Sequence, residues 1–266
     1  MGGSEPPAGG PTPPPSTQRA VGDIDEESAG CLYDFGITHD LVLVGFSGLI
    51  ANELAGFGEP AGPGVSPRPA VPFEFFNTVS TIPVGRVFVR DFEQIFYHRG
   101  VRGLGATIPE VADGLRRLLE PAGRVVFTGQ SAGGYAAILF GTLLGVDDVV
   151  AFSPQTFMTR GLRRLYHDDR WPAEMAAINR IYPLRGRESL NLRRVLDRRN
   201  RCSRIHIHFG ARNRLDAVHA THLEGLPGVS LRPFDTRSHA VARRMREVGM
   251  LRPALLDVLD RPTRGR

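Results

Sequence analysis

Residues 125–135 have the sequence Val125-Val126-Phe127-Thr128-Gly129-Gln130-Ser131-Ala132-Gly133-Gly134-Tyr135, an apolar run followed by a glycine-rich turn and helix-forming residues. This order is typical of a strand that turns sharply into a helix, with Ser131 on the bend. Glycine at positions 129 and 133 lets the backbone approach closely there, so that Oγ of Ser131 projects into a cleft. The pattern predicts a nucleophile elbow.

A Gly-x-Ser-x-Gly pattern arises easily in a chain with 31 glycines, so its context decides the interpretation. Here it follows a strand-like run and precedes the helical stretch 136–140, which is the placement that an elbow requires. On these residues the chain resembles the α/β-hydrolase superfamily, of the serine esterase or thioesterase type. The resemblance implies a doubly wound, mostly parallel sheet, and triad partners in the order serine, acid, histidine.

Both partners occur in that order after later strand-like segments. Residues 205–210 form an apolar run ending in glycine, and Asp216 follows after a short loop; residues 229–234 form the last such run, and His239 follows. Asp235 is the rival acid because it is close to His239 in sequence, but it follows the wrong strand for this superfamily. Separately, Asp216 could cap a helix and His239 could lie on a surface. Their joint occurrence in order favours a catalytic interpretation.

The chemistry explains why these residue types are needed together. A serine hydroxyl becomes a good nucleophile when a histidine takes its proton, and a carboxylate must hold the imidazole in the correct tautomer. The superfamily also uses an oxyanion hole, made by the backbone N–H after the nucleophile and one from the loop after an early strand. Ala132 is the expected first donor, and Phe46 or Ser47 the second.

Six near-continuous apolar runs predict the strands of a parallel sheet covered on both faces. They lie at about 41–46, 86–91, 124–129, 148–153, 204–210 and 229–234. Helical patterns separate them, and the clearest begins with a capping box at Thr107 and Glu110. This alternation indicates right-handed βαβ units. The segment 91–98 follows a strand, so Asp91, Tyr97 and His98 could touch substrate; an ordinary loop whose aromatic residues pack inward is the favoured interpretation.

We expect a Pro- and Gly-rich disordered tail over residues 1–30 and one α/β-hydrolase domain over 31–266, with a lid insertion at about 155–203. A mobile flap at 55–72 is a less favoured alternative to a plain connector. The chain shows neither a secretory signal pattern nor an apolar run long enough to span a bilayer, so a cytoplasmic location is expected.

The expected lid is basic. Between residues 160 and 214 there are fifteen arginines against five acidic residues, whereas the whole chain carries a net charge of only +5. Such a concentration of charge would attract an anionic or carrier-bound acyl substrate, or an acidic carrier protein. An ordinary solvated face is an equally good interpretation. Few aromatic residues lie between the arginines, which argues against nucleic acid as a partner.

Several enzyme classes are disfavoured. The chain has no lysine, which excludes a Schiff base with pyridoxal phosphate and a P-loop. Cys31 and Cys202 are too few for a disulfide framework. The histidine pairs at 206 with 208 and 219 with 222 lack a carboxylate or thiolate at matching spacing, so neither a metal nor another cofactor is expected.

The sequence thus predicts a serine hydrolase that cleaves an ester or thioester through Ser131, His239 and Asp216. Two alternatives stay open. An acyltransferase would use the same acyl-enzyme and pass the acyl group to an alcohol or amine, and a non-catalytic binding protein would use the basic insertion to hold a partner.

Overall fold

The computed structural model describes residues 19–20, 28–36, 38–50, 72–183, 186–198 and 204–261. Eight strands in these ranges form one sheet with the order β1-β2-β4-β3-β5-β6-β7-β8. They are β1 (Arg19–Ala20), β2 (Cys31–Asp34), β3 (Leu41–Phe46), β4 (Gly85–Val89), β5 (Arg124–Gln130), β6 (Asp148–Phe152), β7 (Arg204–Gly210) and β8 (Val229–Phe234). The strands from β4 to β8 across the sheet are parallel, and β1 and β2 extend it antiparallel at one edge.

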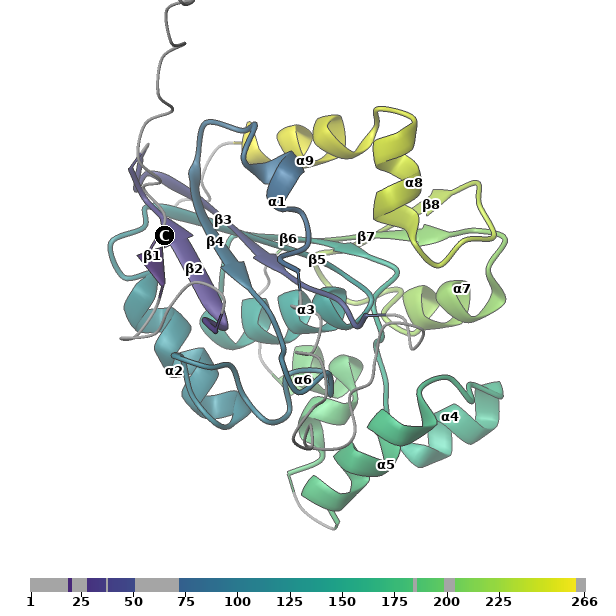
Figure 1. Cartoon of the computed structure of the whole chain (residues 1–266). Helices are drawn as coiled ribbons and strands as arrows, with labels where there is room; N and C mark the ends of the chain where they lie inside the picture. The colour runs from purple at the N-terminus through teal and green to yellow at the C-terminus, as the bar shows by residue number, and fades with distance from the viewer. Residues whose placement is uncertain are drawn as a thin grey trace, which may run out of the picture.

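Helices cover both faces of this sheet (Figure 1). They are α1 (Phe76–Val79), α2 (Ile108–Leu118), α3 (Ala132–Leu144), α4 (Arg160–Tyr166), α5 (Pro172–Ile181), η1 (Glu188–Leu190), α6 (Leu192–Arg198), α7 (Arg214–Thr221), α8 (Val241–Glu247) and α9 (Leu251–Leu259). In Figure 1, α1, α8 and α9 lie above the sheet, and α2, α3 and α6 lie below it. The predicted doubly wound, mostly parallel architecture is confirmed.

Two apolar cores account for the continuous apolar strands. Successive side chains of a strand point to opposite faces. In β3, Val42 and Val44 pack in the core between the sheet and helices α2 and α3, whereas Leu43 packs in the core between the sheet and helices α8 and α9. In β6, Val149 and Val150 divide in the same way. Both faces are therefore removed from water, which is the condition for strands without polar alternation.

The helix α3 follows β5 directly and is apolar around most of its circumference. Its residues from Ala132 to Thr142 are all buried, because it lies against β3, β5 and β6 and is covered by α2 and α6. One half of the predicted capping box is present in α2, where the Thr107 side chain accepts a hydrogen bond from the Glu110 N–H; the Glu110 carboxylate accepts from the Ala106 N–H (2.8 Å) and not from that of Thr107. No helix in the described ranges combines the length and apolarity needed to cross a bilayer.

The expected lid at 155–203 corresponds to a helical segment between β6 and β7, containing α4, α5, η1 and α6. We call this segment the insertion. It is described apart from residues 184–185 and 199–203. Of the expected tail at 1–30, residues 19–20 form β1 and residues 28–30 lead into β2; the rest lies outside the described residues. The possible flap at 55–72, apart from its last residue, and Cys202 lie outside them too.

Candidate active site

Ser131 lies at the bend between β5 and α3, as the elbow pattern predicts. Its backbone has φ 56° and ψ −116°, a conformation that non-glycine residues rarely adopt. Two hydrogen bonds hold it there, from the Ser131 N–H to the Phe152 carbonyl (2.9 Å) and from the Tyr135 N–H to the Ser131 carbonyl (3.0 Å). A Cβ on Gly133 would overlap the Phe46 carbonyl, so only glycine lets α3 approach the end of β3 this closely.

The structure brings the three predicted side chains together. Nε2 of His239 lies 2.9 Å from Oγ of Ser131, and Nδ1 of His239 lies 2.7 Å from Oδ1 of Asp216. Because Asp216 only accepts when it is ionised, Nδ1 carries the proton and Nε2 is left to accept from the serine hydroxyl. Asp216 is fully buried, while 29% of the His239 side chain is exposed.

Local capping positions the acid and the base. The side chain of Asn213 caps α7 by accepting a hydrogen bond from the Asp216 N–H (3.2 Å), so Asp216 sits in the first turn of the helix and does not cap it. The side chain of Gln130, next to Ser131, accepts a hydrogen bond from the Ala242 N–H (2.7 Å). This contact fixes the start of α8, and with it the loop that carries His239, to the end of β5.

The prediction for the second oxyanion donor requires a correction. The N–H of Ser47 donates to the Val89 carbonyl (2.9 Å), which prolongs the pairing of β3 with β4. Phe46 is the last residue of β3 and is paired with β4 on one side and with β5 on the other. Alternate residues of a strand donate their N–H groups to opposite neighbouring strands, so the N–H of Phe46 faces β5 because that of Ser47 faces β4. Neither N–H is available to an oxyanion. Ala132 is the first residue of α3, and its N–H is one of those that a helix start leaves unpaired.

Side chains brace the loop that follows β3. The hydroxyl of Tyr97 donates to the Ser47 carbonyl (2.7 Å), the carboxylate of Glu74 accepts from the Gly48 N–H (2.8 Å), and Gln94 accepts from the Ile50 N–H (2.7 Å). A Cβ on Gly48 would lie 3.8 Å from the Cβ of Ser131, so this loop adjoins the serine. Burial raises the pKa of Glu74 to about 7, and the Gly48 N–H and the charge of Arg246 offset this only in part.

The segment 91–98 forms the inward-packing loop that we expected. The carboxylate of Asp91 accepts hydrogen bonds from the N–H groups of Glu93, Ile95 and Tyr97, at 2.8–3.0 Å. Burial raises its pKa to about 6, although those hydrogen bonds act in the opposite direction. His98 is buried between the hydroxyls of Tyr135 and Tyr182, 3.2 Å from each, and burial lowers its pKa to about 3. The loop therefore ties the core to the insertion.

Two consecutive residues of the insertion reach the triad. Nη1 of Arg170 lies 3.4 Å from Oδ1 of Asp216. The ring of Trp171 lies with its centroid 5.8 Å from that of His239. No feature of the sequence pointed to either contact.

Within the described ranges, the side chains of the remaining candidate residues make no hydrogen bond or ion pair with those of Ser131, Asp216 or His239. The rival acid Asp235 has an 82% exposed side chain and pairs with Arg212 at 2.7 Å. His206 and His208 lie on β7. The other histidine pair is separated in its contacts, with His219 bonded to Asp168 and His222 to Asn191. No group of three or more histidine, cysteine, aspartate or glutamate side chains in the described ranges is arranged to hold a metal ion.

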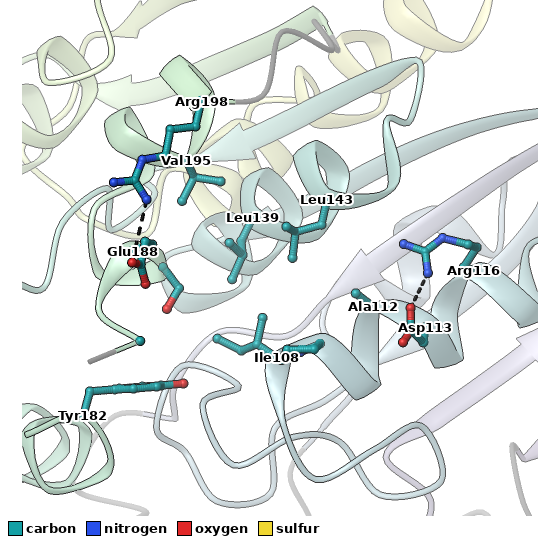
Figure 2. Close-up of a pocket in the computed structure, with 13 residues that line it drawn as sticks. Ile108, Ala112, Asp113, Arg116, Leu139, Leu143, Tyr182, Glu188, Val195 and Arg198 are labelled. Atoms are coloured by element: carbon teal, nitrogen blue, oxygen red, sulfur yellow. Dashed lines mark hydrogen bonds and ion pairs between the residues drawn. The ribbon is translucent and has the colours of Figure 1, made fainter. Parts of the chain in front are cut away.

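A cavity of about 510 Å³ lies between α2, α3 and the insertion (Figure 2). Its wall is mainly apolar and includes Ile108, Ala112, Leu139, Leu143 and Val195. Its two arginines are each paired with an acidic residue, Arg116 with Asp113 and Arg198 with Glu188. At 1.5 Å per residue, its α3 residues are roughly 12 Å or more along the helix from Ser131, so this cavity is separate from the triad.

Solved structures with the same arrangement of strands and helices are similar to the chain over most of its length. An esterase B from Lactobacillus rhamnosis is 12% identical with a TM-score of 0.59, covering 92% of this chain and 85% of its own. The chain has the α/β-hydrolase fold. Other α/β-hydrolase neighbours are the capsule O-acetyltransferase of Neisseria meningitidis serogroup A (12% identity, TM-score 0.59, 87% and 92% covered) and a hormone-sensitive lipase from a metagenome library (16%, 0.52, 86% and 79%).

No family model matches the chain, and no curated protein is similar to it in sequence. The α/β-hydrolase neighbours include hydrolases and an acyltransferase, and at 12–16% identity they show the fold alone.

Proposed function

We propose that the protein is a serine hydrolase that cleaves an ester or thioester through an acyl-enzyme intermediate. The observation that carries the proposal is the continuous chain of contacts from Oγ of Ser131 through His239 to Asp216, at 2.9 and 2.7 Å. Oγ attacks the carbonyl carbon while its proton passes to His239. The proton then goes to the departing alcohol or thiol as its bond to carbon breaks, and a water molecule hydrolyses the acyl-serine by the same route.

The oxyanion of the tetrahedral intermediate needs N–H donors close to Ser131. The Ala132 N–H is the first of these, at the positive end of α3. For the second we propose Leu49. It follows Gly48, whose N–H is already bound to Glu74, and among the described residues the Leu49 N–H has no hydrogen-bond partner.

For the substrate we propose an anionic or carrier-bound acyl group, with the insertion as a lid and an acidic carrier protein as a possible partner. The basic surface is smaller than the sequence indicates, because Arg163 and Arg170 both pair with Asp168 and Arg204 pairs with Asp148. Exposed arginines that support the proposal are Arg160, Arg164, Arg180 and Arg194.

Acyl transfer is the second candidate. Only 8% of Ser131 is exposed, and Trp171 covers part of the base, so an acceptor alcohol could compete with water for the acyl-serine. The likeness to a capsule O-acetyltransferase makes this worth testing. Product analysis with p-nitrophenyl acetate, with and without added glycerol, distinguishes acetate from acetylated glycerol.

A fluorophosphonate probe, which reacts with activated serines, tests the proposal directly. We expect labelling of the wild-type protein that is abolished in Ser131→Ala and reduced at least 100-fold in His239→Ala. Ser80→Ala is the matched control, because Oγ of Ser80 has no hydrogen-bond partner in the described structure, and it should label like the wild type. Absence of labelling that depends on Ser131 would instead favour the non-catalytic binding protein.

A further inference from the structure

The guanidinium group of Arg170 touches both the triad and the insertion. It makes two hydrogen bonds to the carboxylate of Asp168, from Nε (2.8 Å) and Nη2 (3.1 Å). Nη2 also donates to the Gln155 side chain (3.3 Å), and Nη1 contacts Oδ1 of Asp216 at 3.4 Å. Oδ2 of Asp216 has no hydrogen-bond partner among the described residues. Both Nη1 of Arg170 and Nδ1 of His239 contact the other oxygen, Oδ1.

Asp168, the carboxylate that binds Arg170, is itself held by a hydrogen bond from His219. Nδ1 of His219 accepts the Thr156 N–H (3.0 Å), which leaves the proton of the neutral ring on Nε2, where it is donated to Asp168 (3.0 Å). Burial raises the pKa of Asp168, but the hydrogen bonds from His219 and Arg170 dominate and hold it well below its usual range. Asp168 is therefore a fixed anion that orients the Arg170 fork, with Arg163 on its other side at 3.5 Å.

The next residue extends the contact to the base. Trp171 has φ 51° and ψ 57°, in the left-handed region, and this turn aims its ring toward His239 while the Arg170 guanidinium lies 4.7 Å above it. Phe96 also packs against the ring in a T-shaped arrangement, at a centroid distance of 6.0 Å. One dipeptide of the insertion thus places a cation against the acid and an indole against the base.

We propose that Arg170 is a positioning residue that keeps His239 in its neutral, proton-accepting form at lower pH than the Asp216–His239 pair alone would allow. This inference rests on the proposed function. Among the described residues, His219 from α7 also interacts electrostatically with Asp216, whereas two charged groups of the insertion lie one contact further away: Asp168 contacts Arg170, and Arg163 contacts Asp168.

The direction of the effect follows from charge. Nη1 of Arg170 and Nδ1 of His239 both contact Oδ1 of Asp216, at 3.4 and 2.7 Å, so the two nitrogens are at most about 6 Å apart. A fixed positive charge at that distance disfavours the imidazolium, and it also neutralises part of the carboxylate that stabilises the imidazolium. Removing this charge should therefore move the acidic limb of the pH–rate profile to higher pH.

The experiment measures kcat/KM for p-nitrophenyl acetate between pH 5 and 9 in wild-type protein, Arg170→Met and Arg170→Lys. We expect the midpoint of the acidic limb to rise by about one pH unit in Arg170→Met, and to stay within half a unit of wild type in Arg170→Lys, which retains the charge. Arg170→Gln replaces the Met variant if that variant lacks the native circular-dichroism spectrum.

Arg163→Met is the matched control, because Arg163 contacts the same Asp168 and the Arg170 carbonyl but does not contact Asp216. Its midpoint should equal that of the wild type. An unchanged midpoint in the neutral Arg170 variants, or an equal rise in Arg163→Met, would overturn the inference and reduce Arg170 to a structural contact. Failure of the proposed function is seen separately, as a wild-type protein whose Ser131 does not react with the fluorophosphonate.

Discussion

Gly133→Ala tests whether the close approach of α3 to β3 is what shapes the site. The added Cβ would lie 2.8 Å from the carbonyl carbon of Phe46, nearer still to its oxygen, and 3.0 Å from the carbonyl carbon of Ser47. Favourable carbon contacts need about 3.5–4.0 Å, so α3 and β3 must separate by about 1 Å. All the opposing atoms are backbone, and no rotamer change can relieve the overlap.

Both stability and activity should fall. Overpacking costs about 1–3 kcal/mol, and the gain in helix propensity returns about 0.5–1 kcal/mol, so we expect a net loss of about 1 kcal/mol and a fall in Tm of roughly 2–4 °C. The displacement moves Ser131 relative to the loop that begins at Ser47. A misplacement of about 1 Å lowers kcat/KM by about 100-fold.

The assays are calorimetric Tm and the rate of p-nitrophenyl acetate hydrolysis, with Gly161→Ala in α4 as control. A Cβ on Gly161 meets nothing within 4 Å, and we expect wild-type activity with equal or slightly higher Tm. Wild-type Tm and activity in Gly133→Ala would refute the reasoning about the elbow. A lower Tm with full activity would refute the link between this packing and catalysis.

Two further predictions concern carboxyl groups. Asp216→Asn should lower kcat by about 10³–10⁴-fold, because an amide cannot stabilise the imidazolium or enforce the Nδ1–H tautomer of His239; pre-steady-state kinetics with the nitrophenyl ester will measure this, and a fall below tenfold would contradict it. In the folded protein the pKa of Glu74 is raised from 4.5 to about 7. Between these two pH values the folded state binds more protons than the unfolded state, so the free energy of unfolding falls as the pH rises from 4.5 to about 7. Glu74→Gln, which can still accept the Gly48 N–H, should flatten the fall between pH 4.5 and 7 in urea unfolding; an unaltered slope would show that Glu74 is not its source.

Most of the sheet was predictable because its strands are buried on both faces. The predicted runs at 41–46, 204–210 and 229–234 coincide with β3, β7 and β8, and the others differ by one or two residues at their ends. The strands β1 and β2 were not predicted. They have two and four residues, and backbone pairing at the sheet edge, not an apolar run, defines them.

The placement of Ser131, Asp216 and His239 was predictable because each follows a recognisable strand in sequence. The contact of Arg170 with Asp216 was not, since it joins segments 46 residues apart that share no pattern. The oxyanion prediction failed at Ser47 for a related reason. Whether a backbone N–H is free depends on strand register, and only the structure shows that the pairing of β3 with β4 continues one residue past the strand.

Trp171 is the only tryptophan of the chain, and its ring contacts both the guanidinium of Arg170 and the imidazole of His239. Ultraviolet light at the red edge of the absorption band therefore excites a single indole, and that indole lies beside the proposed catalytic base. Its emission wavelength and lifetime depend on the polarity around it and on any quenching by a protonated imidazole. The protein thus carries an optical reporter of its own, which records both movement of the insertion and the ionisation of His239 without an attached dye.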